Sequence, residues 1–170
     1  MWNAVSYFEN LNSILIATNG IHKFCRVSGL DLLEDVLNNY SKDVAFTAVD
    51  DSDDGVTIQR GGAFFNRRAV MVYILKKYDF KSMLDREAKL NECRAIYQSL
   101  LSKVIRDSAV IDELMFLDKT RFPYHELPGM FVAGTTGIYF MLTLEEPVNL
   151  VYNSICWVQS FDKSFDKTFG

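Results

Sequence analysis

The pattern of apolar and polar residues along the chain predicts three helices. In residues 2–17, and again in residues 29–40, apolar side chains recur at steps of three and four, which gathers them on one face of a helix. A longer pattern of this kind fills residues 82–107, and Ser82 is well placed to cap its first turn. The expected buried positions are Trp2, Val5, Phe8, Leu11 and Leu15 in the first helix; Leu33, Val36, Leu37 and Tyr40 in the second; and Leu90, Cys93, Tyr97, Leu100 or Leu101, and Val104 in the third.

Runs rich in β-branched and aromatic residues predict the strands. The strongest is residues 69–78, whose nearly continuous apolar character is typical of a central strand covered on one or both faces. Glycine pairs and polar turns separate the other strands, and two prolines mark residues 120–129 as a loop. The predicted strands are 44–49, 56–60, 69–78, 131–134, 137–144 and 150–158.

The order of these elements indicates the fold class. Two helices, three strands, a long helix and three more strands (α-α-β-β-β-α-β-β-β) favour an α+β protein, with an antiparallel β-sheet flanked by helices, over a series of βαβ units. The 170 residues suffice for one domain with its own core, and 49% apolar with 24% charged residues is ordinary globular composition. We expect one α+β domain over residues 1–159 and a C-terminal tail over residues 160–170.

The predicted tail contains a short repeat. Phe161, Phe165 and Phe169 recur at every fourth residue, and Asp and Lys follow the first two of them. Chain ends are commonly frayed, so one interpretation is a solvated tail. The other is a docking segment that becomes ordered against a neighbouring subunit.

Charge and cysteine content narrow the classes of function. The formal net charge is −4 and the basic residues are spread along the chain, whereas a nucleic-acid-binding protein concentrates them in a stripe. Three widely spaced cysteines without a CxxC pair indicate neither a zinc site nor a disulfide framework. No apolar run approaches the roughly 18 residues of a membrane-spanning helix. We expect a soluble, intracellular protein with no nucleic-acid partner, no membrane association and no metal or cofactor.

Residues suited to metal binding or acid catalysis form no complete motif. The loop at residues 50–55 matches the opening of an EF-hand calcium loop, but position 61, where a bidentate acid belongs, is glycine. A solvated turn is the favoured interpretation. Glu145 and Glu146 are adjacent in a predicted strand and therefore point to opposite faces, unlike the paired carboxylates of a glycosidase. The glycine turns at 61–62 and 134–137 lack the Lys-Ser/Thr of a phosphate-binding loop.

A cysteine nucleophile is the remaining catalytic option. It would place Cys93 or Cys156 beside His22 or His125, with Asp162 as an orienting acid, because a thiol needs a neighbouring base to ionise at neutral pH. No local motif brings these residues together, and both cysteines lie on predicted core faces. We therefore expect a protein that is not an enzyme and has no catalytic residue.

One segment has the composition of a contact surface. Residues 61–68 are expected to form a loop between two strands, and this loop contains Phe64, Phe65, Arg67 and Arg68. Aromatic residues and arginine are enriched at the centres of protein interfaces. Two alternatives stay open here: a surface that contacts another protein, and phenylalanines packed beneath a hairpin.

The chain resembles a known family in the order of its predicted elements. The elements that carry this resemblance are the strand at 69–78, which Asp79-Phe80 follows, the helix at 82–107, and the late strands at 137–144 and 150–158. These elements are similar to the tail-terminator and tail-completion proteins of tailed bacteriophages, and to related ring-forming proteins of the neck and of contractile injection systems. The resemblance covers most of the chain as a pattern and matches no signature residue. It implies a non-enzymatic homo-oligomer, with the ring shape typical of that family, that joins other virion or tail proteins. Its expected location is the virion and, during assembly, the host cytoplasm.

Three hypotheses about function follow. The first is a virion or tail assembly subunit that acts through contacts between subunits. The second is a small cellular adaptor domain that binds another protein through Phe64 and Phe65. The third is an enzyme of unidentified class, which requires a concave pocket that collects His125, an acid and Cys156. The interface residues expected under the first hypothesis are Phe64, Phe65, Arg67, Arg68, Phe161, Phe165 and Phe169.

Overall fold

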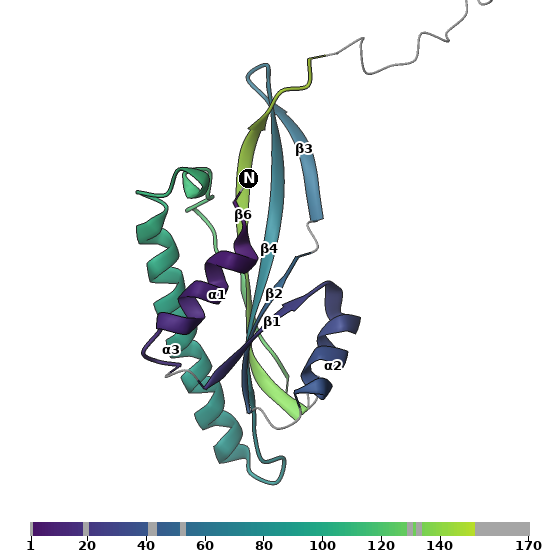
Figure 1. The fold of residues 1–170 in the computed structure, drawn as a ribbon, viewed down its shortest axis with the longest axis vertical. Helices are drawn as coiled ribbons and strands as arrows, with labels where there is room; N and C mark the ends of the chain where they lie inside the picture. The colour runs from purple at the N-terminus through teal and green to yellow at the C-terminus, as the bar shows by residue number, and fades with distance from the viewer. Residues whose placement is uncertain are drawn as a thin grey trace, which may run out of the picture.

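A six-stranded mixed β-sheet forms the long axis of the protein, with helices packed against one end of it (Figure 1). The computed structural model describes residues 2–18, 21–40, 44–51, 54–128, 131 and 134–151. The predicted α+β class is confirmed. The elements in chain order are α1 (Ala4–Ile14), β1 (His22–Val27), α2 (Gly29–Asn39), β2 (Ala45–Asp50), β3 (Asp54–Arg60), β4 (Ala63–Lys77), α3 (Met83–Asp107), the 3₁₀ helix η1 (Asp112–Leu114), β5 (Tyr124–Glu126) and β6 (Thr135–Val148).

The long strands β4 and β6 form the centre of the sheet. They pair antiparallel along almost their whole length, from Phe64 opposite Val148 to Lys77 opposite Thr135. On the other side of β4, β3 pairs with its N-terminal half and β2 with its C-terminal half. β1 extends the sheet beyond β2, and β5 lies beyond β6. The sheet is therefore widest at the end where the helices pack and narrows to β3, β4 and β6 at the other end.

Strand β1 was not predicted from the sequence pattern. It pairs with β2 in parallel, with His22 opposite Ala45, so the sheet is mixed rather than wholly antiparallel. Parallel neighbours require a crossover connection, and α2 supplies it between β1 and β2. Lys23 and Arg26 occupy exposed positions of β1, and these charged residues obscure its apolar pattern.

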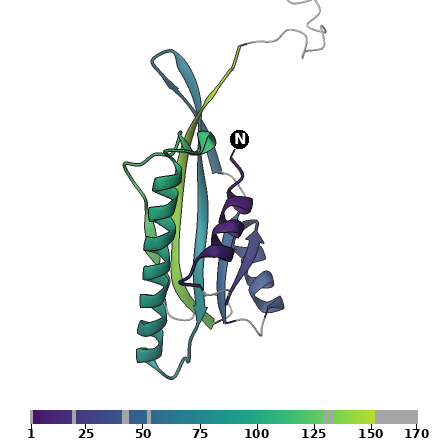
Figure 2. The same ribbon diagram turned by 60° about the vertical axis from the view of Figure 1, so that its left-hand side comes forward.

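Different helices cover the two faces of the sheet (Figures 1 and 2). On one face, α1 and α3 pack around a core that includes Phe8, Leu100 and Phe140. On the other face, α2 buries Leu33 and Leu37. Alternate residues of β4 divide between the two cores because successive side chains of a strand point to opposite faces. Val70, Val72 and Ile74 belong to the first core, and Tyr73 and Leu75 to the second.

The three predicted helices are confirmed. The side chains expected to be buried are buried or half-buried, except for Tyr40, which follows α2 and is 38% exposed. Ser82 caps α3 as predicted: its Oγ accepts a hydrogen bond of 3.1 Å from the backbone N–H of Asp85. This bond satisfies one of the N–H groups that the first turn of a helix leaves without an intrahelical partner.

We expect Ser82→Ala to lower the free energy of unfolding by about 1 kcal/mol, the usual cost of losing an N-cap side chain. Ser102→Ala is the matched control, because Ser102 lies on the exposed side of the same helix and donates only to the Ser99 carbonyl. Its effect should stay within about 0.5 kcal/mol. Urea denaturation followed by circular dichroism measures both, and equal losses from the two variants would contradict the capping role.

Strand β4 begins earlier than predicted. It starts at Ala63 rather than at residue 69, so the prediction that residues 63–68 form a loop is wrong. The turn itself is Gly61-Gly62, with φ values of 56° and 85°, which match a two-residue hairpin turn of type I′. The described helices leave most of this part of the strand uncovered (Figure 1). Polar side chains therefore occupy both of its faces and hide the alternation that marks a strand.

The C-terminal third of the chain departs from the prediction in two places. The three-residue strand β5 lies inside the segment predicted as a loop and pairs with β6. Of the predicted hairpin, β6 is confirmed and is longer than expected, while Phe131 contributes an isolated bridge to Thr135. The predicted strand at 150–158 lies outside the described residues from residue 152 onward, as does the tail with Phe161, Phe165 and Phe169.

Candidate assembly interface

At the end of the sheet away from α2, β3 and the parts of β4 and β6 beside it form a three-stranded ribbon (Figures 1 and 2). We define this ribbon as β3, residues 63–69 of β4 and residues 141–148 of β6. The Gly61-Gly62 turn joins its first two strands, and the register aligns side chains in rows across all three. One row contains Ile58, Phe65 and Pro147, and the next contains Val56, Arg67 and Glu145.

One face of the ribbon presents apolar side chains. Phe65 lies on the same side of the sheet as Tyr73 and Leu75, because residues an even number of positions apart share a face. Tyr73 and Leu75 pack beneath α2, but α2 lies against the other end of the sheet (Figure 1). Val56, Ile58, Phe65 and Pro147 lie on this side of the ribbon, and we name this group the apolar ribbon face. Val56 and Pro147 are exposed, and Ile58 and Phe65 are half-buried.

Charged residues on this same face join the three strands. Arg60 Nη1 lies 2.7 Å from Glu145 Oε2, and Arg67 Nε lies 2.9 Å from Glu145 Oε1. Arg67 also reaches Asp118, at 3.7 Å. Hydrogen bonds from Thr120, together with the nearby arginines, hold the pKa of Asp118 below its usual range. The Asp118 carboxylate therefore stays ionised at neutral pH. The ion pairs of Arg60 and Arg67 with Glu145 link the three strands of the ribbon.

Strand alternation separates the four interface residues predicted in this region. Phe65 and Arg67 lie on the apolar ribbon face, whereas Phe64 and Arg68 lie on the opposite face. Phe64 is 37% exposed and Arg68 only 8%. The four residues therefore do not form one surface. Sequence reasoning missed Val56 and Ile58, although their alternation within the predicted strand at 56–60 was a usable signal.

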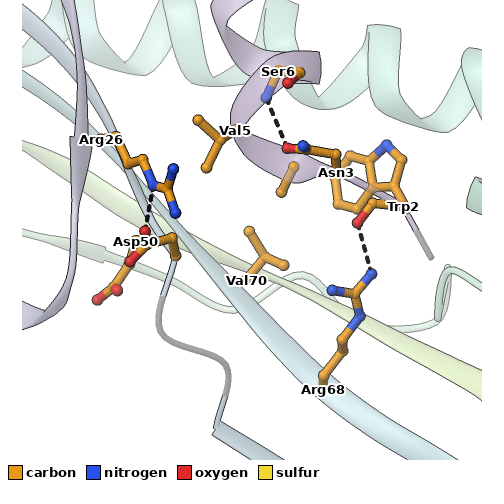
Figure 3. Close-up of a pocket in the computed structure, with 10 residues that line it drawn as sticks. Trp2, Asn3, Val5, Ser6, Arg26, Asp50, Arg68 and Val70 are labelled. Atoms are coloured by element: carbon orange, nitrogen blue, oxygen red, sulfur yellow. Dashed lines mark hydrogen bonds and ion pairs between the residues drawn. The ribbon is translucent and has the colours of Figure 1, made fainter.

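Arg68 belongs to the packing of α1 rather than to an exposed surface. Its guanidinium donates a hydrogen bond of 2.9 Å to the carbonyl of Trp2. It borders a cavity of about 430 Å³ between the start of α1 and the ends of β1 and β2 (Figure 3). Asn3 caps α1 on one side of this cavity, and Arg26 pairs with Asp51 on the other. The hydrogen bond of Arg68 with Trp2 joins the N-terminal segment to the sheet, which points to a structural role for Arg68.

Two edges of the sheet are protected against pairing with another chain. β1 carries the charged side chains of Lys23 and Arg26, and β5 has only three residues. Short edge strands and charged side chains both disfavour further pairing. Beside the ribbon, residues 116–118 run along β6 and bond to it, with the Asp118 N–H donating to the Thr143 carbonyl at 2.8 Å.

Among the residues that the structure describes, nothing comparable protects the outer edge of β3. β3 has seven residues and pairs with β4 on one side, and no described strand pairs with its other side. Its central residues, Gly55, Val56, Thr57, Ile58 and Gln59, include neither a charge nor a proline. An edge of this kind is a template on which another strand can form hydrogen bonds.

The predicted catalytic candidates do not come together among the described residues. Cys93 lies on the buried face of α3, and burial raises the pKa of its thiol to about 12, so the nucleophilic thiolate is not populated at neutral pH. His125 stacks on Tyr139 at 5.3 Å, on the opposite side of the sheet. His22 is buried, and burial lowers its pKa to about 4. Cys156 and Asp162 lie outside the described residues.

The other sequence expectations about chemistry can be placed on the fold. Glu145 and Glu146 point to opposite faces, as predicted, and pair with Arg67 and Arg68 respectively. In the described part of the chain, no group of three or more His, Cys, Asp or Glu residues could hold a metal ion. Within those same ranges, no helix is long and apolar enough to cross a membrane. No protein-family model matches this chain, and no curated protein matches its sequence.

Proposed function

We propose that this protein is a non-enzymatic assembly subunit that associates with copies of itself and with other virion proteins at the tail or neck of a tailed phage. In this proposal it acts in the manner of a tail-terminator protein, in the virion and, before that, in the host cytoplasm. The observation that carries the proposal is the ribbon. It presents the apolar ribbon face, against which none of the described helices packs, and an edge of β3 with which no described strand pairs.

The physical properties of the ribbon suit it to a contact between subunits. Burying apolar surface contributes about 2.5 kcal/mol for each 100 Å² removed from water, and Val56 alone is 54% exposed. The ion pairs of Arg60 and Arg67 with Glu145 hold the strands in place before any partner arrives. A preorganised surface loses less conformational entropy on binding than a loop does. The ribbon therefore offers affinity together with a defined geometry.

The test is the mass of the purified protein in solution, measured by light scattering over a wide range of concentration. We expect a discrete multiple of the 19.5 kDa chain at high concentration. Val56→Lys should weaken this association at least about tenfold, because burying an unpaired charge in the contact is costly. The monomer should stay folded, since Val56 is exposed.

Leu84→Lys is the control for that variant. Leu84 is 86% exposed in the first turn of α3, at the end of the molecule away from the ribbon (Figure 1). It should associate like the unmodified protein. A strict monomer at every concentration would contradict the proposed self-association, and an equal loss from both variants would place the contact outside the ribbon.

A second surface favours the alternative function of a small adaptor domain. A groove between the end of α1 and α3 is lined by Leu11, Ile14 and Leu15, with Lys103 and Arg106 also along it. Ile14 is 68% exposed. An apolar groove with basic residues suits the apolar face of an acidic amphipathic helix. A protein that remains monomeric and binds such a peptide, with affinity lost in Ile14→Glu, would support this alternative over the assembly subunit.

A further inference from the structure

We infer that β3 pairs with the β3 strand of a second copy of this chain, antiparallel and around a twofold axis at Thr57. This inference rests on the proposed function, because it specifies one contact through which the subunits associate. The strand that pairs with the outer edge of β3 is thus the β3 strand of the second copy. The sheets of the two subunits then form one continuous sheet.

The turn determines which backbone groups of β3 face outward. In a two-residue hairpin, the pair next to the turn, here Arg60 and Ala63, exchanges backbone hydrogen bonds. The antiparallel ladder then alternates, so every second residue directs its N–H and C=O away from β4. In β3 these residues are Gly55, Thr57 and Gln59, whose backbone groups point to the side where no described strand lies.

The three outward-facing residues are arranged symmetrically about Thr57. If Thr57 lies opposite Thr57 of the second copy, Gly55 lies opposite Gln59, and all three pairs are of the hydrogen-bonded kind. About six backbone hydrogen bonds result, two for each such pair. A shift by one residue would set outward-facing groups against inward-facing ones and lose these bonds. The strand is thus complementary to itself in this register.

The same register joins the apolar ribbon faces of the two copies. Val56 lies opposite Ile58 of the second copy, so four β-branched side chains meet at the twofold axis. Phe65 flanks them within each subunit, because it pairs with Ile58. Cross-strand pairs of β-branched and aromatic residues stabilise a strand pair relative to pairs of alanine. The apolar surface therefore continues across the contact.

The size of the contact indicates a weak dimer. A strand of seven residues is roughly 23 Å long, and one strand edge with its apolar neighbours buries less than the roughly 1,200 Å² of a stable standard interface. We therefore expect association at high protein concentration, strengthened when further contacts form. Such a subunit stays free until it is assembled.

Cysteine cross-linking tests the axis directly. Thr57→Cys and Gln59→Cys are compared in a Cys156→Ser background, and the two cysteines among the described residues, Cys25 and Cys93, are buried. The two Thr57 Cα atoms would lie about 5.5 Å apart, within reach of a disulfide. The two Gln59 positions would be separated by four residues, roughly 13 Å. We expect Thr57→Cys to form a covalent dimer under mild oxidation at least ten times faster than Gln59→Cys.

Gln59→Pro provides a second measurement. Proline at this position removes an outward N–H but no hydrogen bond to β4, and proline is tolerated in edge strands. We expect at least tenfold weaker self-association in light scattering, with the thermal unfolding temperature of the monomer unchanged. Removal of residues 160–170 should leave the association unchanged. If the truncated protein no longer dimerises, residues 160–170 rather than a second β3 strand pair with the outer edge of β3, and the inference is overturned.

The outcomes separate this inference from the proposed function. If the protein self-associates, but both cysteine variants cross-link at the same rate or Gln59→Pro associates normally, the β3 contact is wrong and the assembly role stands. If the protein is monomeric at every concentration and neither cysteine variant cross-links, both fail. Faster cross-linking at Thr57, with weakened association of Gln59→Pro, supports both.

Discussion

Replacing Gly137 with alanine is expected to lower the free energy of unfolding by about 3 kcal/mol or more, the upper range for overpacking a buried site. Gly137 lies near the start of β6, opposite Leu75 of β4. A Cβ atom there would lie 2.0 Å from the carbonyl oxygen of Ile74 and 3.0 Å from the Cα of Leu75. Both contacts are with backbone, so a side-chain rotation cannot relieve them. The central β4–β6 pair, from which the ribbon extends, would have to separate locally.

Gly55→Ala is the matched control, because Gly55 is also in the sheet. A Cβ at Gly55 would lie 3.6 Å from the Arg67 carbonyl oxygen, an ordinary contact. The expected change in the free energy of unfolding is within about 1 kcal/mol, the range for a glycine replaced where the backbone is compatible with alanine. Urea denaturation of both variants measures the difference. A Gly137→Ala protein as stable as Gly55→Ala would contradict the close approach of β4 and β6.

Acidification from pH 7 to pH 4 is expected to lower the free energy of unfolding by about 3 kcal/mol through His22 alone. Burial, and then the charge of Lys76, lowers the pKa of His22 from 6.5 to about 4. The folded protein therefore keeps this imidazole neutral at pH values where the unfolded chain takes up a proton. Each tenfold change in proton affinity between the folded and unfolded states corresponds to about 1.4 kcal/mol. The lowering of the pKa of His22 from 6.5 to about 4 therefore corresponds to about 3 kcal/mol of stability lost by pH 4.

The direction and range of this effect follow from linkage. Above pH 6.5, His22 is neutral in both states and contributes no pH dependence. Between pH 6.5 and about 4 the unfolded chain binds more protons, so stability falls as the pH falls. Below about pH 4 both states are protonated and the loss is complete. The surroundings explain the cost: His22 Nδ1 lies 3.3 Å from Thr47 Oγ1, and the nearby Lys76 is already paired with Glu92.

His22→Asn isolates this contribution from the titration of carboxylates. Denaturant unfolding at several pH values between 7 and 4 should show a weaker loss of stability in this variant than in the unmodified protein. His125→Asn is the control, because His125 is exposed on β5, and it should reproduce the parent curve. If all three proteins lose stability equally over this range, His22 is not the group responsible.

Local sequence signals predicted the helices and the turn. The steps of three and four among apolar residues place Phe8, Leu37 and Leu100 on buried faces, and all three are buried. Ser82 caps α3, and Gly61-Gly62 forms a turn between strands. Each of these features depends on residues within one or two turns of chain, so the information is contained in a short segment.

The strands of the candidate interface depended on pairing over longer distances. Arg67 and Glu145 are 78 positions apart in the sequence, yet they face each other across β4 and β6. The polar composition of residues 63–68 suggested a loop, but pairing with β3 on one side and β6 on the other makes them a strand. That pairing also placed Phe64 and Phe65 on opposite faces, so the predicted aromatic surface was divided.

Short-range signals in the sequence were enough to predict the α+β class, the three helices, the Gly61-Gly62 turn and the opposite orientation of Glu145 and Glu146. Three features became apparent only in the folded protein: the parallel pairing of β1, the burial of Arg68, and the face that Val56 and Ile58 share with Phe65. The physical reason is the range of the interactions. Helix periodicity, caps and tight turns depend on residues close together in the chain. Whether a strand has an exposed face or an unpaired edge depends instead on which distant segments pack against it.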